Sequence, residues 1–192
     1  MIKVIIFDFG EVIGYRKSSF RKELEKNIGK KIKSFKLKQE VIDKFIIGKI
    51  NEDQFWEMIK IRPKKSYKNF FLKEYEKNVR IKKGMLKILK SLKKKGYNLV
   101  LASNLIKPQS LFLKKKLSKY FSLLIFSCEI GTQKPYKKFY STVLKRLNVR
   151  GEECLFIDNE EENIKTAKLF GMKTILFKNT KQLKEELKKF LP

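Results

Sequence analysis

Four apolar runs of the sequence are each followed by side chains that could do chemistry. These side chains carry two carboxylates, a hydroxyl, two amides and an ammonium group: Asp8, Ser103, Asn104, Lys134, Asp158 and Asn159. Carboxylate oxygens are hard ligands that suit Mg²⁺, and hydroxyl and ammonium groups stabilise the oxygens of a transferring phosphoryl group. Taken singly, each residue also fits an ordinary role in a turn or a helix cap. Their recurrence after successive apolar runs predicts a site for a divalent metal and a phosphate.

The apolar runs alternate with amphipathic segments along most of the chain. Strands are expected at 2–9, 97–104, 122–128, 153–159 and 172–177, and helices at 84–96, 108–121, 135–149, 161–171 and 179–191. Fully apolar strands that alternate with helices predict an α/β fold, with a Rossmann-like parallel sheet and helices on both faces. In such sheets ligands bind beyond the carboxyl ends of the strands, where the polar residues would meet.

A stretch with helical periodicity interrupts this alternation directly after the first strand. Helices are expected there at 20–28, 38–48, 51–59 and 67–78. In the third of them Asn51 is a favourable N-cap, and Phe55, Trp56 and Ile59 form an apolar stripe. We therefore expect a small all-helical cap domain at 15–79, inserted into a Rossmann-like core domain that consists of 1–14 and 80–192.

The composition excludes several classes of chemistry and of partner. The chain of 192 residues has no histidine, which excludes Ser-His-Asp and Cys-His catalysis and histidine-ligated zinc. The net charge is +27, but only six of the 47 basic residues are arginines, whereas specific nucleic-acid readers rely on the planar fork of arginine. We expect no specific nucleic-acid partner, only weak non-specific binding to polyanions at low salt.

The location of the protein can also be predicted from the sequence. No apolar stretch reaches transmembrane length and no signal-peptide pattern precedes the first strand, so we expect no membrane partner. Cys128 and Cys154 lie in apolar, strand-like runs and are expected to be buried, reduced thiols. Reduced thiols in turn predict a cytoplasmic location.

Four motifs follow one another in a recognisable order. They read FDFGEVI, LVLASN, GTQKPYKKFY and CLFIDNEEENIKTAKLFGMKTILF. This order resembles the haloacid dehalogenase-like (HAD) hydrolase superfamily, in particular the branch with a helical cap inserted after the first strand. The first motif is similar to members that begin FDFGGV or FDLGNV, a group that includes sugar-phosphatase-like proteins. The resemblance extends over the whole chain, the cap included.

The resemblance implies a Mg²⁺-dependent phosphohydrolase that acts on a small phosphorylated metabolite, with a sugar phosphate as one candidate. Asp8 would be the nucleophile and would take the phosphoryl group as an aspartyl-phosphate. Ser103 and Lys134 would also be catalytic. Together with Asn104 they would hold the phosphoryl oxygens, and Lys134 would neutralise the developing charge.

The resemblance also implies a metal site and a moving cap. Mg²⁺ would be bound by Asp8, Asp158 and the main-chain carbonyl of Gly10, while Asn159 and Asn163 would orient the ligands around it. Asn159 stands where a second acid is usual, which removes a charge but keeps an oxygen. The cap would close over the site, exclude water and contact the substrate.

Two positions of the first motif depart from the family pattern. Gly10 stands where most family phosphatases have the aspartate that protonates the leaving alkoxide, and Glu11 stands where a glycine or asparagine is usual. Losing a general acid typically costs about two to four orders of magnitude in rate. Either the substrate has a good leaving group, or Glu11 is a substitute acid, or the protein binds without useful hydrolysis.

Two other functional classes stay open on the sequence. A haloacid dehalogenase-type hydrolase would use Asp8 against carbon without Mg²⁺. It would need an arginine and an aromatic residue around the substrate carboxylate and halide, for which Arg16 and Tyr15 are candidates. A catalytically weak, polyanion-binding HAD-like protein is the third class, and it is indicated by the charge alone.

Overall fold

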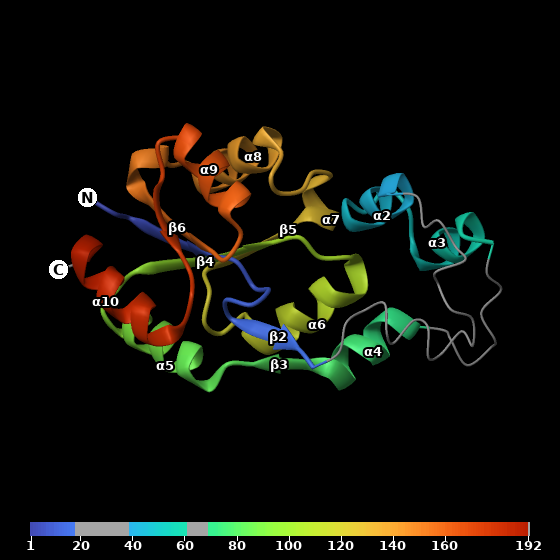
Figure 1. The fold of residues 1–192 in the computed structure, drawn as a ribbon, viewed down its shortest axis with the longest axis horizontal. Coiled ribbons are helices and arrows are strands. Elements are labelled where there is room, and N and C mark those ends of the chain that lie inside the picture. The colour runs from blue at the N-terminus through green and yellow to red at the C-terminus, as the bar shows by residue number, and fades with distance from the viewer. Residues whose placement is uncertain (18–38, 61–68, 192) are drawn as a thin grey trace.

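The centre of the protein is a five-stranded sheet with the first strand in the middle (Figure 1). The computed structural model describes residues 1–17, 39–60 and 69–191. The strand order is β5-β4-β1-β6-β7, and every neighbouring pair is parallel. The strands are β1 (Val4–Phe7), β4 (Asn98–Ser103), β5 (Leu123–Phe126), β6 (Cys154–Asp158) and β7 (Lys173–Leu176). Each lies within a predicted strand, so the expected α/β fold is confirmed.

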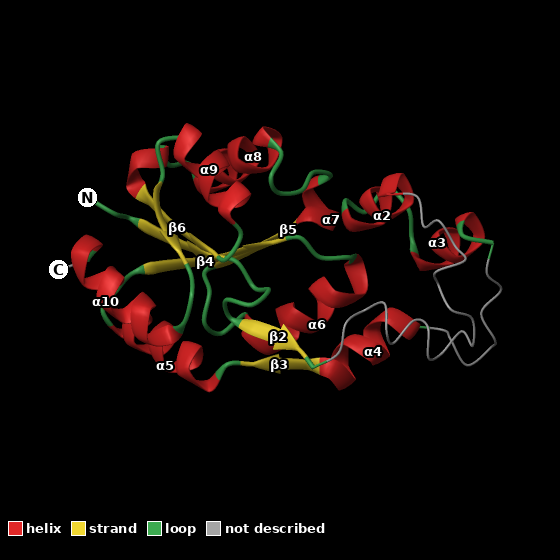
Figure 2. Ribbon diagram, viewed as in Figure 1, coloured by secondary structure: helices red, strands yellow, loops and turns green. Residues whose placement is uncertain are grey.

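Helices cover both faces of this sheet (Figure 2). The helices that share one apolar cluster are α5 (Lys83–Lys94), α6 (Lys107–Leu117) and α10 (Thr180–Phe190). Those that share the opposite cluster are α8 (Lys137–Leu147) and α9 (Glu161–Leu169). Two short helices, α7 (Ser127–Ile130) and the 3₁₀ turn η3 (Gly151–Glu153), join the larger elements and were not expected from the sequence.

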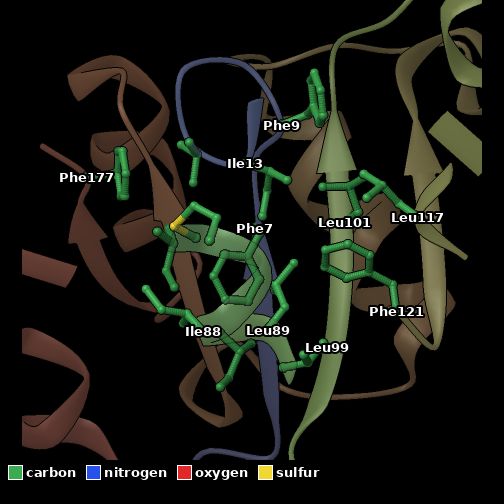
Figure 3. Packing of buried hydrophobic residues seen from close by; sticks show 14 of the residues in the cluster. Phe7, Phe9, Ile13, Ile88, Leu89, Leu99, Leu101, Leu117, Phe121 and Phe177 are labelled. Atoms are coloured by element: carbon green, nitrogen blue, oxygen red, sulfur yellow. The ribbon is translucent and has the colours of Figure 1, made fainter. Parts of the chain in front are cut away.

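The central strand β1 is apolar throughout because both of its faces are buried. Ile5 and Phe7 belong to the cluster under α5 and α6, while Val4 and Ile6 belong to the cluster under α8 and α9, as the alternation of side chains along a strand requires. The ring of Phe7 packs edge-on against Phe121 at 6.3 Å between centroids (Figure 3). Burying one such large apolar side chain stabilises the fold by roughly 1.5–3 kcal/mol.

The register of the sheet decides which polar residues meet at its carboxyl edge. Phe7 pairs with Leu101 of β4 and with Ile157 of β6. The next residue, Asp8, donates its backbone N–H to the Ile157 carbonyl at 2.9 Å. Asp8 and Asp158 therefore lie side by side, one residue beyond the paired Phe7 and Ile157.

The chain enters and leaves the cap through a two-stranded antiparallel ribbon. Its strands are β2 (Gly14–Arg16) and β3 (Val79–Ile81), with Tyr15 opposite Arg80. The ribbon straddles both expected domain boundaries, so the ends of the segment 15–79 are strand and not helix. The described cap helices are α2 (Gln39–Ile46), α3 (Glu52–Met58) and α4 (Phe70–Asn78). The helix expected at 20–28 lies outside the described residues.

The cap has an aromatic core of its own. Phe55, Trp56 and Ile59 of the predicted stripe are buried there, and the Phe55 ring stacks on Phe45 at 4.6 Å. Asn51 caps α3 as predicted: its side chain accepts the Gln54 N–H at 2.9 Å, and the Gln54 side chain accepts the Asn51 N–H at 2.9 Å. This reciprocal pair satisfies two backbone donors that the first turn of the helix leaves free.

Hydrogen bonds fasten helix α2 of the cap to the core. The Gln133 side-chain amide donates to Asp43 of α2 at 2.9 Å. The Ser127 hydroxyl donates to the Ile46 carbonyl at the end of α2 at 2.8 Å. Gln133 directly precedes Lys134, so the cap is joined to the loop that carries the candidate catalytic lysine.

The structure also bears on the expected burial of the two cysteines and on the expected lack of a membrane-spanning helix. Both cysteines are free thiols, and Cys154 is buried in β6 as expected. The expectation was wrong for Cys128, which is half-buried and lies in helix α7, not in a strand. Burial raises the pKa of Cys154 to about 11. Among the described residues no helix has the length and apolar character needed to cross a membrane.

Candidate functional site

A cavity of about 370 Å³ opens at the carboxyl edge of the sheet. Every residue that the sequence assigned to the site lines it: Asp8, Gly10, Glu11, Ser103, Asn104, Lys134, Asp158, Asn159 and Asn163. These residues come from the ends of β1, β4 and β6, from the loops that follow β1 and α7, and from the first turn of α9 (Asn163). The structure therefore brings the four motifs together, as the parallel topology requires.

Lys134 joins the two aspartates at the centre of the site. Its Nζ lies 2.6 Å from Asp8 Oδ1 and 2.6 Å from Asp158 Oδ2. The three residues are between 0% and 6% exposed, so little water screens these charges. By formal charge, two carboxylates and one ammonium leave this buried group with one surplus negative charge.

The burial of this group shifts the pKa of two of its members. Burial raises the pKa of Asp8, nearby Asp158 adds to the rise, and Lys134 offsets part of it. Burial alone would lower the pKa of Lys134, but the two carboxylates outweigh burial and raise it. Lys134 therefore stays protonated and carries the charge that allows two carboxylates to approach each other.

Ser103 and Asn104 at the end of β4 differ in what they contact. The Ser103 hydroxyl donates to Asp8 Oδ1 at 2.8 Å. Asn104 instead holds the loop of the lysine: its Nδ2 donates to the Lys134 carbonyl at 2.9 Å, and its Oδ1 accepts the Lys134 N–H at 2.9 Å. The Asn104 side chain is thus engaged in positioning Lys134, which leaves its backbone for the expected contact with a phosphoryl group.

Asp158 is held by the start of helix α9. Asn163 Nδ2 lies 3.1 Å from both carboxylate oxygens of Asp158, and the backbone N–H of Glu160 donates to Asp158 Oδ1 at 2.9 Å. Asn159 does not contact Asp158 through its side-chain amide, whose Nδ2 donates to Glu160 Oε1 at 2.9 Å. Glu160 lines the cavity and was not singled out as a site residue in the sequence, where it reads as the first of three consecutive glutamates at the start of α9.

Gly10 and Glu11 line the cavity beside Asp8. A Cβ placed on Gly10 would meet Asp8 Oδ2 at 3.5 Å, an ordinary contact distance, so the glycine is not required by a close approach. The Gly10 carbonyl accepts the Val12 N–H at 2.7 Å and keeps a second lone pair. Glu11 has a φ of 53°, a left-handed conformation that favours glycine or asparagine, which are the usual residues here in the family.

Glu11 is exposed and has one weak ionic partner in the described part of the chain. Its Oε2 lies 3.9 Å from Lys82 Nζ, and the Lys82 ammonium donates to the Glu11 main-chain carbonyl. The Glu11 carboxylate therefore lies at the cavity wall, unburied.

The oxygen atoms of the site can be compared with the ligands that Mg²⁺ prefers. Within 1–17, 39–60 and 69–191 no group of three or more acidic, cysteine or histidine side chains could hold a metal. Mg²⁺ does not require one, because it is usually held by one or two carboxylates together with waters and substrate phosphate oxygens. The surplus negative charge of the Asp8–Lys134–Asp158 group and the hard oxygens of Asp8, Asp158 and Gly10 fit such an ion.

Two further residues of the cavity come from the boundary of the cap. Arg16 ends β2, and its guanidinium lies over the ring of Tyr75 of α4, 5.1 Å from the centroid. Both residues line the cavity. The sequence pointed to Arg16 but missed Tyr75, because 58 intervening residues separate them along the chain and only the ribbon of β2 and β3 brings them together.

The chain belongs to the haloacid dehalogenase-like hydrolase family, whose pattern it matches over residues 5–177. It is a HAD-like hydrolase. The solved HAD family enzyme from Bacteroides thetaiotaomicron, in complex with magnesium and inorganic phosphate, has the same fold. That structure superposes with a TM-score of 0.74 at 22% identity and covers 93% of this chain and 95% of the enzyme.

Curated relatives match shorter stretches. Bifunctional epoxide hydrolase 2 of Rattus norvegicus is 34% identical over 115 residues, which are 57% of this chain and 21% of that protein. The phosphorylated carbohydrates phosphatase of Thermotoga maritima is 28% identical over 121 residues, 58% of this chain and 56% of the relative. The chain thus spans about a fifth of the length of the first relative and about half that of the second.

Proposed function

We propose that the protein is a Mg²⁺-dependent phosphohydrolase that acts on a small phosphorylated metabolite through an aspartyl-phosphate at Asp8. The observation that carries this proposal is the buried Asp8–Lys134–Asp158 group at the carboxyl edge of the sheet, with both Lys134 contacts at 2.6 Å. A carboxylate that is held beside an ammonium group and opens into a cavity can attack the phosphorus of a bound ester.

The two carboxylate oxygens of Asp8 have different surroundings, which suggests different roles in this attack. Asp8 Oδ1 accepts from both Lys134 and Ser103, so the carboxylate is held in one orientation. The other oxygen, Asp8 Oδ2, lies beside Gly10, 3.5 Å from where a Cβ on that residue would be. We assign Oδ2 as the attacking oxygen, which forms the new bond to phosphorus while the ester oxygen leaves with the electron pair of the broken bond.

The second step releases phosphate and restores the enzyme. A water molecule attacks the phosphorus of the aspartyl-phosphate, the bond from phosphorus to Asp8 breaks, and the Asp8 carboxylate and inorganic phosphate are formed. Lys134 and Ser103 stabilise the oxygens of the phosphoryl group in both steps. Asp8, Asp158 and the Gly10 carbonyl would hold Mg²⁺, which supplies positive charge to those oxygens when it is bound.

Gly10 provides no carboxyl group that could protonate the leaving oxygen, so the site favours substrates whose leaving group needs no proton. Glu11 is exposed and its carboxylate lies 3.9 Å from Lys82 Nζ, so we do not assign it as the acid that protonates the leaving oxygen. We therefore propose that the natural substrate is an anomeric, acyl or aryl phosphate, whose leaving group departs without a proton. A sugar phosphate esterified at the anomeric carbon fits this requirement, and the likeness to a phosphorylated carbohydrates phosphatase supports it.

The segment 15–79 is proposed to act as a cap that covers the substrate. Tyr15, Arg16 and Tyr75 line the cavity, and the hydrogen bond between Gln133 and Asp43 joins cap and core. Closure of this segment over the cavity would exclude water that competes with the first step.

The test is hydrolysis of p-nitrophenyl phosphate and acetyl phosphate with Mg²⁺ and with EDTA. We expect turnover only with Mg²⁺, and none in Asp8→Asn, which keeps the shape of the side chain. Asp53→Asn on the exposed side of α3 is the matched control and should retain turnover. Metal-independent release of halide from a 2-haloalkanoic acid, with no phosphatase activity, would instead identify a dehalogenase and refute the proposal.

A further inference from the structure

Arg16 is a half-buried cation with no acidic partner in the described structure. No ion pair among residues 1–17, 39–60 and 69–191 includes its guanidinium. Its contact is with the face of Tyr75, which offers an electrostatic attraction but no hydrogen-bond acceptor in the plane of the guanidinium. Withdrawing a charge from water without a hydrogen-bonding partner is costly, and an anion that enters the cavity would supply the partner that the described residues do not.

Tyr75 beside it has an unused hydroxyl. The residue is 4% exposed, and its hydroxyl is the one buried side-chain polar atom without a hydrogen-bond partner in the described part of the chain. The ring is held in place by Phe9 and by Phe112, at centroid distances of 6.4 and 5.7 Å. An unpaired buried hydroxyl costs stability, and this one belongs to a residue that lines the same cavity as Asp8.

Arg16 also marks where the active-site cavity meets a second one. A neighbouring cavity of about 200 Å³ is lined by Arg16 together with Asn104 and Leu105, which also line the first. Its remaining walls are mostly apolar and include Phe45 and Phe55 of the cap. Asp8, Ser103 and Lys134 do not line it, so Arg16 serves the part of a substrate that extends away from the reacting phosphorus.

We propose that Arg16 and the Tyr75 hydroxyl bind a second anionic group, a carboxylate or a second phosphate, on the leaving-group side of the substrate. This inference rests on the proposed phosphohydrolase function and narrows its substrate class to phosphate esters with two anionic ends. The guanidinium donates to the second anion as a planar fork, and the phenol donates a further hydrogen bond. Ser103 and Lys134 remain with the transferring phosphoryl group.

Matched aryl phosphates test this substrate class. The anionic probes are 4-carboxyphenyl phosphate and benzene-1,4-diyl bisphosphate, and the neutral reference is 4-carbamoylphenyl phosphate, which has nearly the shape of the first. We expect kcat/KM for at least one anionic probe to exceed that of the neutral reference by about tenfold or more, the worth of a hydrogen bond to a charged group. The two probes separate a carboxylate site from a phosphate site. Equal values for all three compounds would overturn the inference.

Variants assign the preference to these side chains. Arg16→Gln should bring the ratio of anionic to neutral kcat/KM close to one, and Tyr75→Phe should lower it in part. Arg146→Gln removes the same charge from an exposed position of α8 and should keep the wild-type ratio. Arg16→Lys keeps the positive charge but loses the planar guanidinium, so it should give an intermediate ratio. If Arg16→Gln does not fold, Arg16→Lys takes its place in the test. A preference that survives in Arg16→Gln or Arg16→Lys unchanged contradicts the assignment.

A binding measurement separates this inference from the proposed function. Calorimetric titration compares 4-hydroxybenzoate with its neutral amide, and 4-hydroxyphenyl phosphate with hydroquinone, on the wild type and on Arg16→Gln. If no phosphate ester is hydrolysed, the phosphohydrolase proposal fails. If the wild type binds the anionic compound more tightly than its neutral counterpart, and Arg16→Gln does not, the anion site is still supported. Equal affinities of the wild type for the anionic and neutral compounds overturn the anion site.

Discussion

Gly10→Asp tests whether this glycine is the missing general acid. The substitution is sterically admissible: a Cβ at this position meets only Asp8 Oδ2, at 3.5 Å, and Gly10 is not among the residues with positive φ. The new carboxyl group would lie in the cavity beside Asp8 and Asp158, which leave one negative charge in excess even after Lys134 is counted. Like charges raise the pKa of a carboxyl group, which favours the protonated form that an acid catalyst needs.

The expected gain depends on the leaving group. A positioned general acid contributes about 10²- to 10⁴-fold, but only where the departing oxygen is basic enough to need a proton. We therefore expect Gly10→Asp to raise kcat for alkyl monoesters by about 10²-fold or more and to change p-nitrophenyl phosphate little. The assay is a Brønsted plot of log kcat against leaving-group pKa for a series of phosphate esters, which should be steep in the wild type and flatter in the variant.

Gly10→Asn is the matched control, because it adds nearly the same volume without a transferable proton. It should show no gain on any ester. An equal gain for aryl and alkyl esters, a gain in Gly10→Asn, or a flat plot for the wild type with chemistry rate-limiting would each refute the argument. The glycine would then need another explanation, such as space for a bulky substrate.

Four further outcomes follow from the contacts of the site and the core. Lys134→Met should abolish turnover and lower the unfolding free energy by about 3–5 kcal/mol, because it leaves two buried carboxylates without a counter-charge; chemical denaturation that shows no loss would contradict this. Glu11→Gln should leave the rates of alkyl and aryl esters alike unchanged, whereas a loss confined to alkyl esters would make Glu11 the acid. Asp43→Ala removes the acceptor of Gln133 and should raise KM about fivefold, as expected for one hydrogen bond of about 1 kcal/mol, while Asp53→Ala serves as the control. Burial raises the pKa of Cys154 from 9.0 to about 11, so its contribution to stability is present below pH 9 and is lost as the pH rises toward 11; at neutral pH, Ellman's reagent should leave this thiol unlabelled in the native protein.

The sequence was sufficient to predict the strands of the sheet, because each of them is a short apolar run bounded by turn residues or helices. The polar residues at the strand ends could also be assigned, since parallel strands present their carboxyl ends at one edge. For Asp8 and Asp158 this rule was enough to predict that they line one cavity with Lys134.

Other features depend on contacts between residues far apart in the chain. The ribbon of β2 and β3 has only three residues in each strand, too few for a periodicity to be visible. Tyr75 reads as part of an amphipathic helix, and nothing local indicates that its hydroxyl lacks a partner. The direction of the Asn104 side chain toward the Lys134 backbone likewise depends on how two loops meet. These are tertiary outcomes, which local pattern does not encode.

Asp8 is proposed to carry the phosphoryl group during turnover. The direct measurement is to quench the enzyme with acid during hydrolysis of acetyl phosphate, reduce it with borohydride and map the modified residue by mass spectrometry, because an acyl phosphate is reduced to an alcohol. We expect Asp8 to be converted to homoserine in the wild type and Asp8→Asn to be neither modified nor active. Turnover with an unmodified Asp8, or wild-type activity in Asp8→Asn, would contradict it.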